Sequence, residues 1–205
     1  VTNNKIVLDR TELNQDNTGQ NLPYLLSRVP ALVATSDDGL GVGYTYFRIR
    51  GTDHTRINMT VNDVPLNDSE SQTVFWVNMT DMASSMTSLN VQRGVGTSTN
   101  GSASFGASIN MSTSAPHHLI TSSPDSLIAS SVGLTFNGGM YNTFREMINA
   151  HIVLPNHWRA NARFSKVNSD GFLYRTTSDL YSYYGDLGWY GAKTEVVGRF
   201  FGGSE

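Results

Sequence analysis

The stretch LNVQRGVGTSTNGSASFGASINMST, residues 89–113, decides how the rest of the sequence is interpreted. Residues 90–93 have the pattern of a short strand and residues 107–111 resume as a strand, while residues 94–106 hold four glycines among Ser, Thr and Asn, which is the chemistry of turns. The segment matches neither a GxGxxG nor a Walker pattern and no helix pattern follows it, so a nucleotide-binding loop is not expected. A single cation, Arg93, stands where the first strand becomes the loop.

The composition describes a domain-sized chain with few charges. The chain has 205 residues, of which 15% are charged, a formal net charge of −3 and no cysteine. This length allows a sizeable core, and the charge gives no support for binding nucleic acid. The lack of cysteine excludes a disulfide framework, a cysteine-based zinc site and a thiol nucleophile. No run approaches about 18 consecutive apolar residues, so no membrane-spanning helix is expected, and both a soluble protein and a β-barrel satisfy that test.

The first half of the sequence predicts a small mixed domain of short strands, two short helices and much loop. Apolar residues at helical spacing predict a helix over residues 21–29, and Thr80 or Asp81 could cap a second helix ending near Met86. Residues 11–19 are polar and have the pattern of a turn. The strands are expected at residues 5–10, 31–35, 46–50, 57–61 and 89–93.

From residue 127 onward apolar side chains recur at every second position, which predicts long strands. Ten-residue alternating strands with aromatic residues near their ends are typical of an outer-membrane barrel, and a soluble antiparallel sheet with one wet face gives the same pattern. Because about five strands cannot close a transmembrane barrel, the barrel interpretation makes this sequence a fragment. The five strands are expected at residues 127–137, 141–154, 157–168, 179–192 and 194–202.

Several motifs, in this order, resemble the plug domain of TonB-dependent outer-membrane receptors. They are IRG at 49–51, NDVPLND at 62–68, VQRGVGTS at 91–98, FG at 105–106 and ASIN at 107–110. Val95 stands where proline is common in that family, and Ala107-Ser108 replaces a Gly-Gly pair. Residues 169–172, 178–180 and 191–194 resemble early barrel strands of such receptors from Bacteroidetes-type bacteria.

This resemblance implies an α+β plug domain, a small mixed sheet with short helices, over residues 1–115. A linker over residues 116–126 and antiparallel β-strands over residues 127–205 would follow. The latter are the first about five strands of a truncated, roughly 22-stranded transmembrane β-barrel.

The resemblance also implies a receptor that imports a scarce ligand, such as a ferric chelate, haem, a cobalamin or a glycan. Energy would come from the proton gradient through the partner TonB, which would pull on a peptide expected upstream of Val1. The other expected partners are the small-molecule or metal-chelate ligand and the lipid of the bacterial outer membrane.

By the same resemblance, Arg50 and Arg93 match the arginines of the IRG and QRG motifs, which pair with barrel glutamates and latch the plug to the wall. Ordinary solvated arginines at strand ends would give the same sequence. The glutamate partners would lie on later strands, so this chain alone should leave both arginines unpaired or differently paired.

The resemblance further implies that a ligand meets three apical loops of the plug, at residues 37–43, 53–56 and 68–75. Their candidate ligand-facing residues are Asp37, Asp38, His54, Arg56, Glu70 and Gln72. Phe75 and Trp76 are also candidates, but their place in an apolar run favours the core of the plug. The alternative for each polar residue is a solvated loop without a ligand.

No metal, cofactor or catalytic site is expected. His117 and His118 are adjacent, so they point to different faces of an extended chain, and no third ligand is near them. No nucleophile elbow, HExxH motif or coherent acid pair occurs, so the chain is not expected to be an enzyme. By the resemblance, Arg159 and Arg163 would line the barrel lumen and face the plug. A basic lumen could attract an anionic chelate, but pairing with acids of the plug is favoured.

Two other functions remain open. A soluble β-rich surface binding or adhesin domain would use the alternating strands in a sandwich. A receptor that also signals to a sigma regulator would need a further N-terminal domain.

Overall fold

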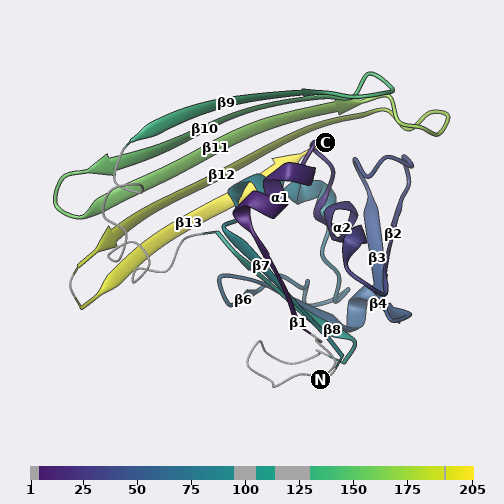
Figure 1. Cartoon of the computed structure of the whole chain (residues 1–205), viewed down its shortest axis with the longest axis horizontal. Helices are drawn as coiled ribbons and strands as arrows, with labels where there is room; N and C mark the ends of the chain where they lie inside the picture. Colours follow the sequence, from purple (N-terminus) through teal and green to yellow (C-terminus); the bar gives the residue numbers. More distant parts are fainter. Residues whose placement is uncertain (1–4, 95–104, 114–129, 192) are drawn as a thin grey trace.

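The computed structural model describes residues 5–94, 105–113, 130–191 and 193–205. A small N-terminal domain, residues 5–113, packs against one face of a sheet of five long strands (Figure 1). The linker expected at residues 116–126 lies outside the described residues.

The central sheet of the N-terminal domain is built around the Gly-rich stretch. Its strand order is β1-β7-β8-β5-β6. Strands β7 and β8 pair antiparallel, with Val91 opposite Ile109, while β5 pairs parallel to β8. The prediction of strand, loop and strand is therefore confirmed at both strands. Their bounds are β1 (Lys5–Asp9), β5 (Ile57–Val61), β6 (Val64–Pro65), β7 (Ser88–Arg93) and β8 (Ala107–Ser112).

A second sheet contains β2 (Leu32–Ser36), β3 (Thr45–Ile49) and β4 (Thr52–Asp53) in that order. Strand β3 alternates strictly, so its odd-numbered residues are buried while Tyr46 and Arg48 point outward. The glycine-rich loop 37–43 and Tyr44 connect β2 to β3.

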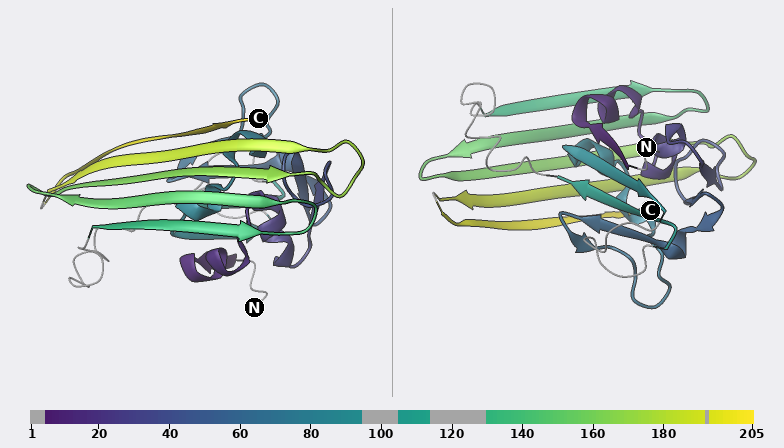
Figure 2. Two further views of the ribbon diagram at one scale, coloured as in Figure 1. Left: turned by 90° about the horizontal axis from the view of Figure 1, so that it is seen from above. Right: turned by 60° about the horizontal axis from the view of Figure 1, so that its bottom comes forward.

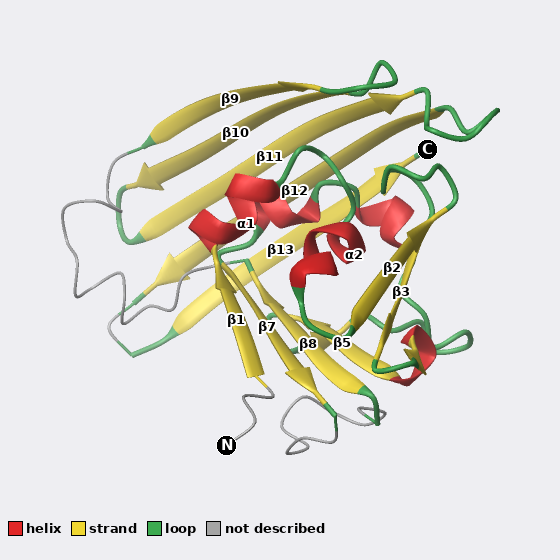
Figure 3. Cartoon of the chain, turned by 45° about the vertical axis from the view of Figure 1, so that its right-hand side comes forward, coloured by secondary structure: helices red, strands yellow, loops and turns green. Residues whose placement is uncertain are grey.

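The helices are short and lie mainly between the small sheets and the long strands (Figure 3). Helix α1 occupies a segment that was expected to be a turn, and the reason is a capping box. The backbone N–H of Glu12 donates to Asp9 Oδ1 at 2.9 Å, and the N–H of Asp9 donates to Glu12 Oε2 at 3.0 Å. The helical elements are α1 (Arg10–Asp16), α2 (Leu22–Leu25), η1 (Leu26–Arg28), η2 (His54–Arg56), η3 (Trp76–Met79) and η4 (Met82–Ser85).

Two helix predictions need correction. The helix expected over residues 21–29 is split into α2 and η1, and the helix expected after Thr80 is only the 3-10 turn η4. Asp81 precedes η4 with φ 56°, and its side chain makes no cap hydrogen bond. Within the described residues, no helix is long and apolar enough to cross a membrane.

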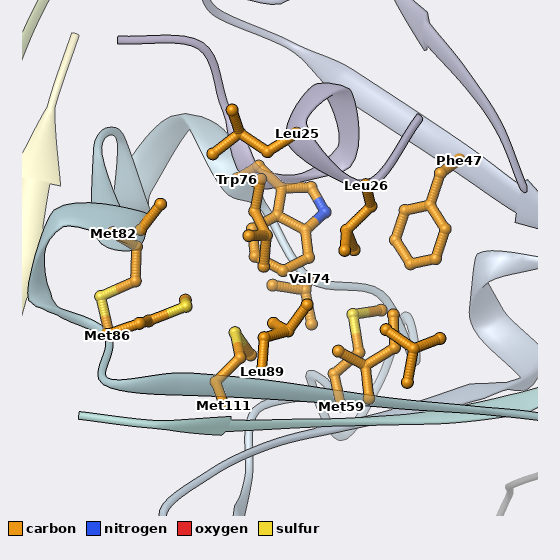
Figure 4. Close-up of a cluster of buried hydrophobic side chains, with 14 of the residues drawn as sticks. Leu25, Leu26, Phe47, Met59, Val74, Trp76, Met82, Met86, Leu89 and Met111 are labelled. Atoms are coloured by element: carbon orange, nitrogen blue, oxygen red, sulfur yellow. The ribbon is translucent and has the colours of Figure 1, made fainter. Parts of the chain in front are cut away.

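The main hydrophobic core lies between the central sheet and the short helices (Figure 4). Leu26, Met59, Leu89 and Met111 are completely buried in it. Trp76 joins this core from η3, with its ring centroid 6.4 Å from that of Phe47. The expectation that Trp76 belongs to the core is therefore confirmed.

The long strands form one antiparallel sheet in the order β13-β12-β11-β10-β9 (Figure 2). Each strand pairs antiparallel with its neighbour in the chain. The alternation of buried and exposed residues along most of β12 confirms the predicted period of two. Apolar side chains such as Leu134, Phe164 and Leu187 are exposed on one face, while the other face meets the N-terminal domain. The strands are β9 (Ser131–Gly138), β10 (Phe144–Leu154), β11 (Trp158–Ser169), β12 (Ser178–Tyr190) and β13 (Glu195–Ser204).

Candidate functional site

A buried ionic network joins the N-terminal domain to the long strands, and the carboxylate of Asp81 is its centre. Arg145 on β10 places Nη2 2.9 Å from Asp81 Oδ1, and Arg163 on β11 places Nη1 3.5 Å from Oδ2. The Asp81 side chain is 0% exposed and both arginine side chains are 4% exposed. Charges removed from water in this way are stable only when they are paired and hydrogen-bonded.

Neutral groups complete the hydrogen bonds around Asp81. Asn17 Nδ2 and Ser84 Oγ donate to Oδ1 at 3.0 and 2.6 Å, and Ser165 Oγ donates to Oδ2. Arg145 Nη1 donates to the carbonyl of Asn17 at 3.0 Å, and Arg163 Nε donates to Ser85 Oγ at 2.6 Å. The network therefore fixes the end of α1 and the segment around η4 to β10 and β11.

The expectation that Arg163 pairs with an acid of the N-terminal domain agrees with this geometry. Arg159 does something different, because its guanidinium lies over the ring of Tyr190, 5.2 Å from the centroid. The sequence around Asp81 did not predict this network. A polar residue before a short apolar run is also the pattern of a helix cap, so Asp81 was interpreted as a candidate cap.

Loop 37–43 also contacts the loop between β11 and β12, and two backbone hydrogen bonds join them. The carbonyl of Asp38 accepts the N–H of Phe172 at 2.9 Å and that of Leu173 at 3.3 Å. The Asp38 side chain is turned inward: its carboxylate accepts the N–H groups of Leu40, Gly41 and Val42. Asp38 was a candidate ligand contact, and in this structure its carboxylate shapes the loop.

Two smaller contacts also cross between the domains. Val42 and Val77 pack with Val167 and Leu180 in a separate apolar cluster. Tyr184 donates from its hydroxyl to Thr113 Oγ1 at 2.8 Å. The N-terminal domain is therefore attached to β11 and β12 at several points along their length.

The two candidate latch arginines lie close together near the turn before β2. The N–H of Arg50 donates to the carbonyl of Ala31 at 2.8 Å, and Arg93 Nη1 donates to the carbonyl of Pro30 at 3.1 Å. A Cβ atom on Gly94 would lie 3.1 Å from Arg50 Nη1, so both side chains reach the same corner. These contacts are internal to the N-terminal domain, and pairing with barrel glutamates stays a prediction.

Two of the three candidate ligand loops, 53–56 and 68–75, meet β3 at an aromatic hollow of about 180 Å³, and no residue of loop 37–43 lines it. Tyr44 follows the first loop, His54 belongs to the second, and Phe75 ends the third. The rings of Tyr46 and His54 have centroids 6.1 Å apart. All lining residues belong to the N-terminal domain; they are Tyr44–Phe47, His54, Ser71 and Thr73–Trp76.

Phe75 corrects one expectation, because its side chain is 50% exposed at this hollow and not part of the core. Tyr44 and Tyr46, 43% and 42% exposed, were not among the predicted ligand contacts. Two tyrosines separated by one residue, next to a glycine-rich loop, were the signal that could have revealed them, since alternate residues share one face of a strand.

The remaining candidates do not line the hollow. Asp37 lies near Tyr46, whose pKa is raised first by partial burial and then by that carboxylate. Arg56 is exposed at the end of η2, and Glu70 and Gln72 are exposed in the turn before the hollow. No group of three or more potential metal-binding side chains occurs among the described residues. His117 and His118 lie outside them.

Asp53 gives a pH-dependent contribution that can be tested. The N–H of Thr55, donated to Oδ1 at 3.1 Å, and the nearby His54 and Arg48 lower the pKa of the Asp53 carboxyl. The stabilisation should be complete above the unfolded pKa of about 4 and be lost as pH falls through the lowered folded pKa. The variant Asp53→Asn can still cap η2. At about pH 6 we expect it to have a slightly lower melting temperature than the parent, and at about pH 2 we expect the two melting temperatures to be equal. Because 43% of the side chain is exposed, the effect should stay below about 1 kcal/mol; a difference that grows in acid would contradict this assignment.

Comparison with known proteins places this geometry in a family. A family model described as "TonB-dependent Receptor Plug Domain" matches residues 1–108, slightly more than half of the chain. No curated protein sequence matches the chain.

Solved structures extend the likeness to the long strands. The copper transporter OprC aligns with a TM-score of 0.69 at 15% identity, over 98% of this chain and 30% of OprC. The siderophore receptor PiuA from Acinetobacter baumannii aligns with a TM-score of 0.68 at 16% identity, over 96% of this chain and 26% of PiuA. The ferripyoverdine receptor of the outer membrane of Pseudomonas aeruginosa aligns with a TM-score of 0.69 at 15% identity, over 94% of this chain and 24% of that receptor.

At these identities the structures show a shared fold alone, and this chain spans a third or less of their length. The family itself consists of transport receptors of the bacterial outer membrane and not of enzymes. With a matching plug domain and the antiparallel strands that follow it in solved relatives, this chain belongs to the family of TonB-dependent receptors.

Proposed function

We propose that this chain is the plug and the first wall strands of an importer that takes up a scarce ligand, powered by TonB and the proton gradient. In this proposal residues 1–115 form the plug, residues 116–126 the linker, and residues 127–205 the beginning of a roughly 22-stranded β-barrel. TonB would act on a peptide upstream of Val1. The family match favours this role over a soluble surface or adhesin domain.

One observation carries the proposal: β3 and the two loops 53–56 and 68–75, which are separate in sequence, line one aromatic hollow formed by plug residues alone. Exposed tyrosine, phenylalanine and histidine rings supply a large contact area at a low cost in side-chain entropy. The ligand we propose is a ferric chelate, haem, a cobalamin or a similar molecule. The solved structures of the same fold that are described as a copper transporter and as a siderophore receptor support a metal chelate within this range. A Bacteroidetes-type origin has support only from the motifs of the early strands.

The function is tested by growth of a strain that lacks the receptor, supplied with one iron or cofactor source at a time. We expect the complete receptor to restore growth on one source and to lose this ability when TonB is deleted. Uptake that does not depend on TonB would contradict the proposal.

Phe75→Ala should weaken ligand binding at the hollow by about tenfold or more, because truncating a central aromatic contact commonly costs about 2 kcal/mol. Phe105→Ala is the matched control, since Phe105 is 72% exposed and does not line the hollow. Binding of the ligand identified by the growth experiment would be measured on the purified receptor. If the two variants bind the ligand with equal affinity, the hollow is not part of the binding site.

Reversing the charge of Arg93 tests the proposed latch. In the complete receptor, Arg93→Glu should increase leakage of a large antibiotic through the barrel, because a desolvated arginine would lose its glutamate partners. Arg28→Glu is the control, since Arg28 is 76% exposed and pairs with Asp16 inside the plug. Leakage that is equal in both variants and in the parent would show that Arg93 does not hold the plug.

A further inference from the structure

The aromatic hollow lies along an edge of strand β3 and not over one of its faces. Successive residues of a strand point to opposite faces, yet all four residues Tyr44–Phe47 line the hollow. Tyr44 and Tyr46 are exposed, whereas Thr45 and Phe47 are buried on the other face. A hollow that is bordered by residues of both faces runs beside the main chain of the strand.

The pairing of β3 with β2 shows which backbone groups point towards the opposite edge. The N–H of Asp37 donates to the carbonyl of Tyr44 at 3.1 Å, directly before the first paired residues of the two strands. Antiparallel strands use alternate residues for their hydrogen bonds, so the even-numbered residues of β3 bond to β2. The backbone groups of Thr45 and Phe47 therefore point away from β2.

This edge of β3 is open at the hollow. Strand β4 covers only its far end, where it pairs with Arg48 and Ile49. In the part of the chain that the structure describes, neither backbone group of Thr45 and not the N–H of Phe47 has a hydrogen-bond partner on this side. The side chain of Thr45 adds a further polar atom, because its Oγ1 is buried without a partner among the same residues.

The far side of the hollow is formed by an extended segment, residues 73–75. Val74 is buried and Phe75 is half exposed, so this segment alternates between the two faces as β3 does. Phe75 has φ −88° and ψ 95°, which is extended backbone. Within the described residues no backbone hydrogen bond joins the segment to Thr45 or Phe47, and the hollow lies between them.

The lining of the hollow carries no fixed charge. Among its described lining residues there is no Lys, Arg, Asp or Glu, and His54 is the single group that can become charged near neutral pH. Such a lining supplies no cation for a carboxylate or a phosphate. It is suited to a neutral ligand that has hydrogen-bonding groups along its length and apolar groups on one side.

We propose that the hollow binds an extended peptide segment, which adds to the open edge of β3 as a further strand. The peptide's backbone would pair with that of Thr45 and Phe47, and its outward side chains would contact the rings of Tyr44, Tyr46 and Phe75. The inference rests on the proposed transport function. It narrows the ligand to a molecule that carries an extended peptide chain, whether or not that chain also holds a metal.

A change on the ligand side tests the proposal with the unmodified complete receptor. Purified receptor is mixed with a random library of pentapeptides whose two ends are capped, and mass spectrometry identifies the peptides that stay bound. We expect enriched peptides with aromatic or aliphatic side chains at alternate positions. A library from which no peptide is enriched would overturn the proposal.

Methylation of single amide nitrogens in the tightest-binding peptide then shows how it binds. Because alternate amides of an added strand face the edge, methylation of one amide should weaken binding about tenfold, while methylation of its neighbour should have little effect. Equal losses at every amide would show that the peptide contacts the hollow without pairing as a strand, which overturns the strand-addition mode.

Thr45→Pro makes the corresponding change in the receptor. Its N–H faces away from β2, so proline removes a donor of the open edge and no hydrogen bond of the sheet. Ala34→Pro is the matched control, because Ala34 lies opposite Phe47 on β2, the outer strand of the same sheet, and its N–H also points away from the partner strand.

We expect Thr45→Pro to bind the selected peptide about tenfold more weakly and Ala34→Pro to bind it like the parent. Melting temperatures of both variants establish that they are folded. If Thr45→Pro does not fold, the methylated peptides decide the question on the unmodified receptor. Equal affinities of the two folded variants would overturn the role of the β3 edge.

The outcomes separate this inference from the proposed function, because peptide binding is measured on purified receptor without TonB. If uptake by the complete receptor does not require TonB, the proposed function fails. If uptake requires TonB but the library yields no bound peptide, the proposed function stands and the inference about the β3 edge is overturned.

Discussion

Asp81→Asn should lower the free energy of unfolding of the plug by about 3–5 kcal/mol, the usual cost of removing one partner from a buried ionic network. The substitution keeps the size of the side chain and its tolerance of the left-handed backbone at φ 56°. It therefore removes the charge that Arg145 and Arg163 share in a site closed to solvent. The measurement is calorimetric unfolding of the purified complete receptor.

A second variant distinguishes charge from packing. The triple variant Asp81→Asn, Arg145→Gln and Arg163→Gln should be more stable than Asp81→Asn alone, because no unpaired charge remains buried. Asp179→Asn is the control: Asp179 is 55% exposed and lies 3.8 Å from Lys166, so its loss should cost less than about 1 kcal/mol. A triple variant less stable than the single one would show that the hydrogen bonds of the network matter more than its charge balance.

Trp76→Ala should destabilise the plug by a similar amount, about 3–5 kcal/mol, because it leaves a cavity in the core. Trp76 is 3% exposed and belongs to the same core cluster as Phe47 and Leu26 (Figure 4). It also forms the inner wall of the hollow, so the cavity would alter the surface that Phe75 presents to a ligand.

The neighbouring residue provides the comparison. Phe75→Ala should change stability by less than about 1 kcal/mol, since its side chain is half exposed. Thermal unfolding of both variants in the complete receptor, followed by ligand binding on the folded protein, checks the contrast. Comparable losses of stability would show that the third loop is part of the core along its whole length.

The pattern of the sequence was sufficient for most of the fold. The stretch at residues 89–113 contains two strands that pair with each other, so local pattern and pairing agree. In the second half, alternation with a period of two can be satisfied only by strands with one apolar face, and all five form. Helix α1 was missed although Asp9 and Glu12 have the spacing of a capping box, a signal present in the sequence.

The sequence alone determined which segments are strands, which face of each long strand is apolar, and which family the motifs resemble, because these properties depend on residues close together in the chain. Only the tertiary structure decided that Asp81 binds Arg145 and Arg163, that the Asp38 carboxylate faces inward, and that Phe75 is exposed while Trp76 is buried. Each of these depends on groups far apart in the sequence. The cost of burying an unpaired charge or polar group makes such partners necessary, but only the packing of the plug against the wall selects them.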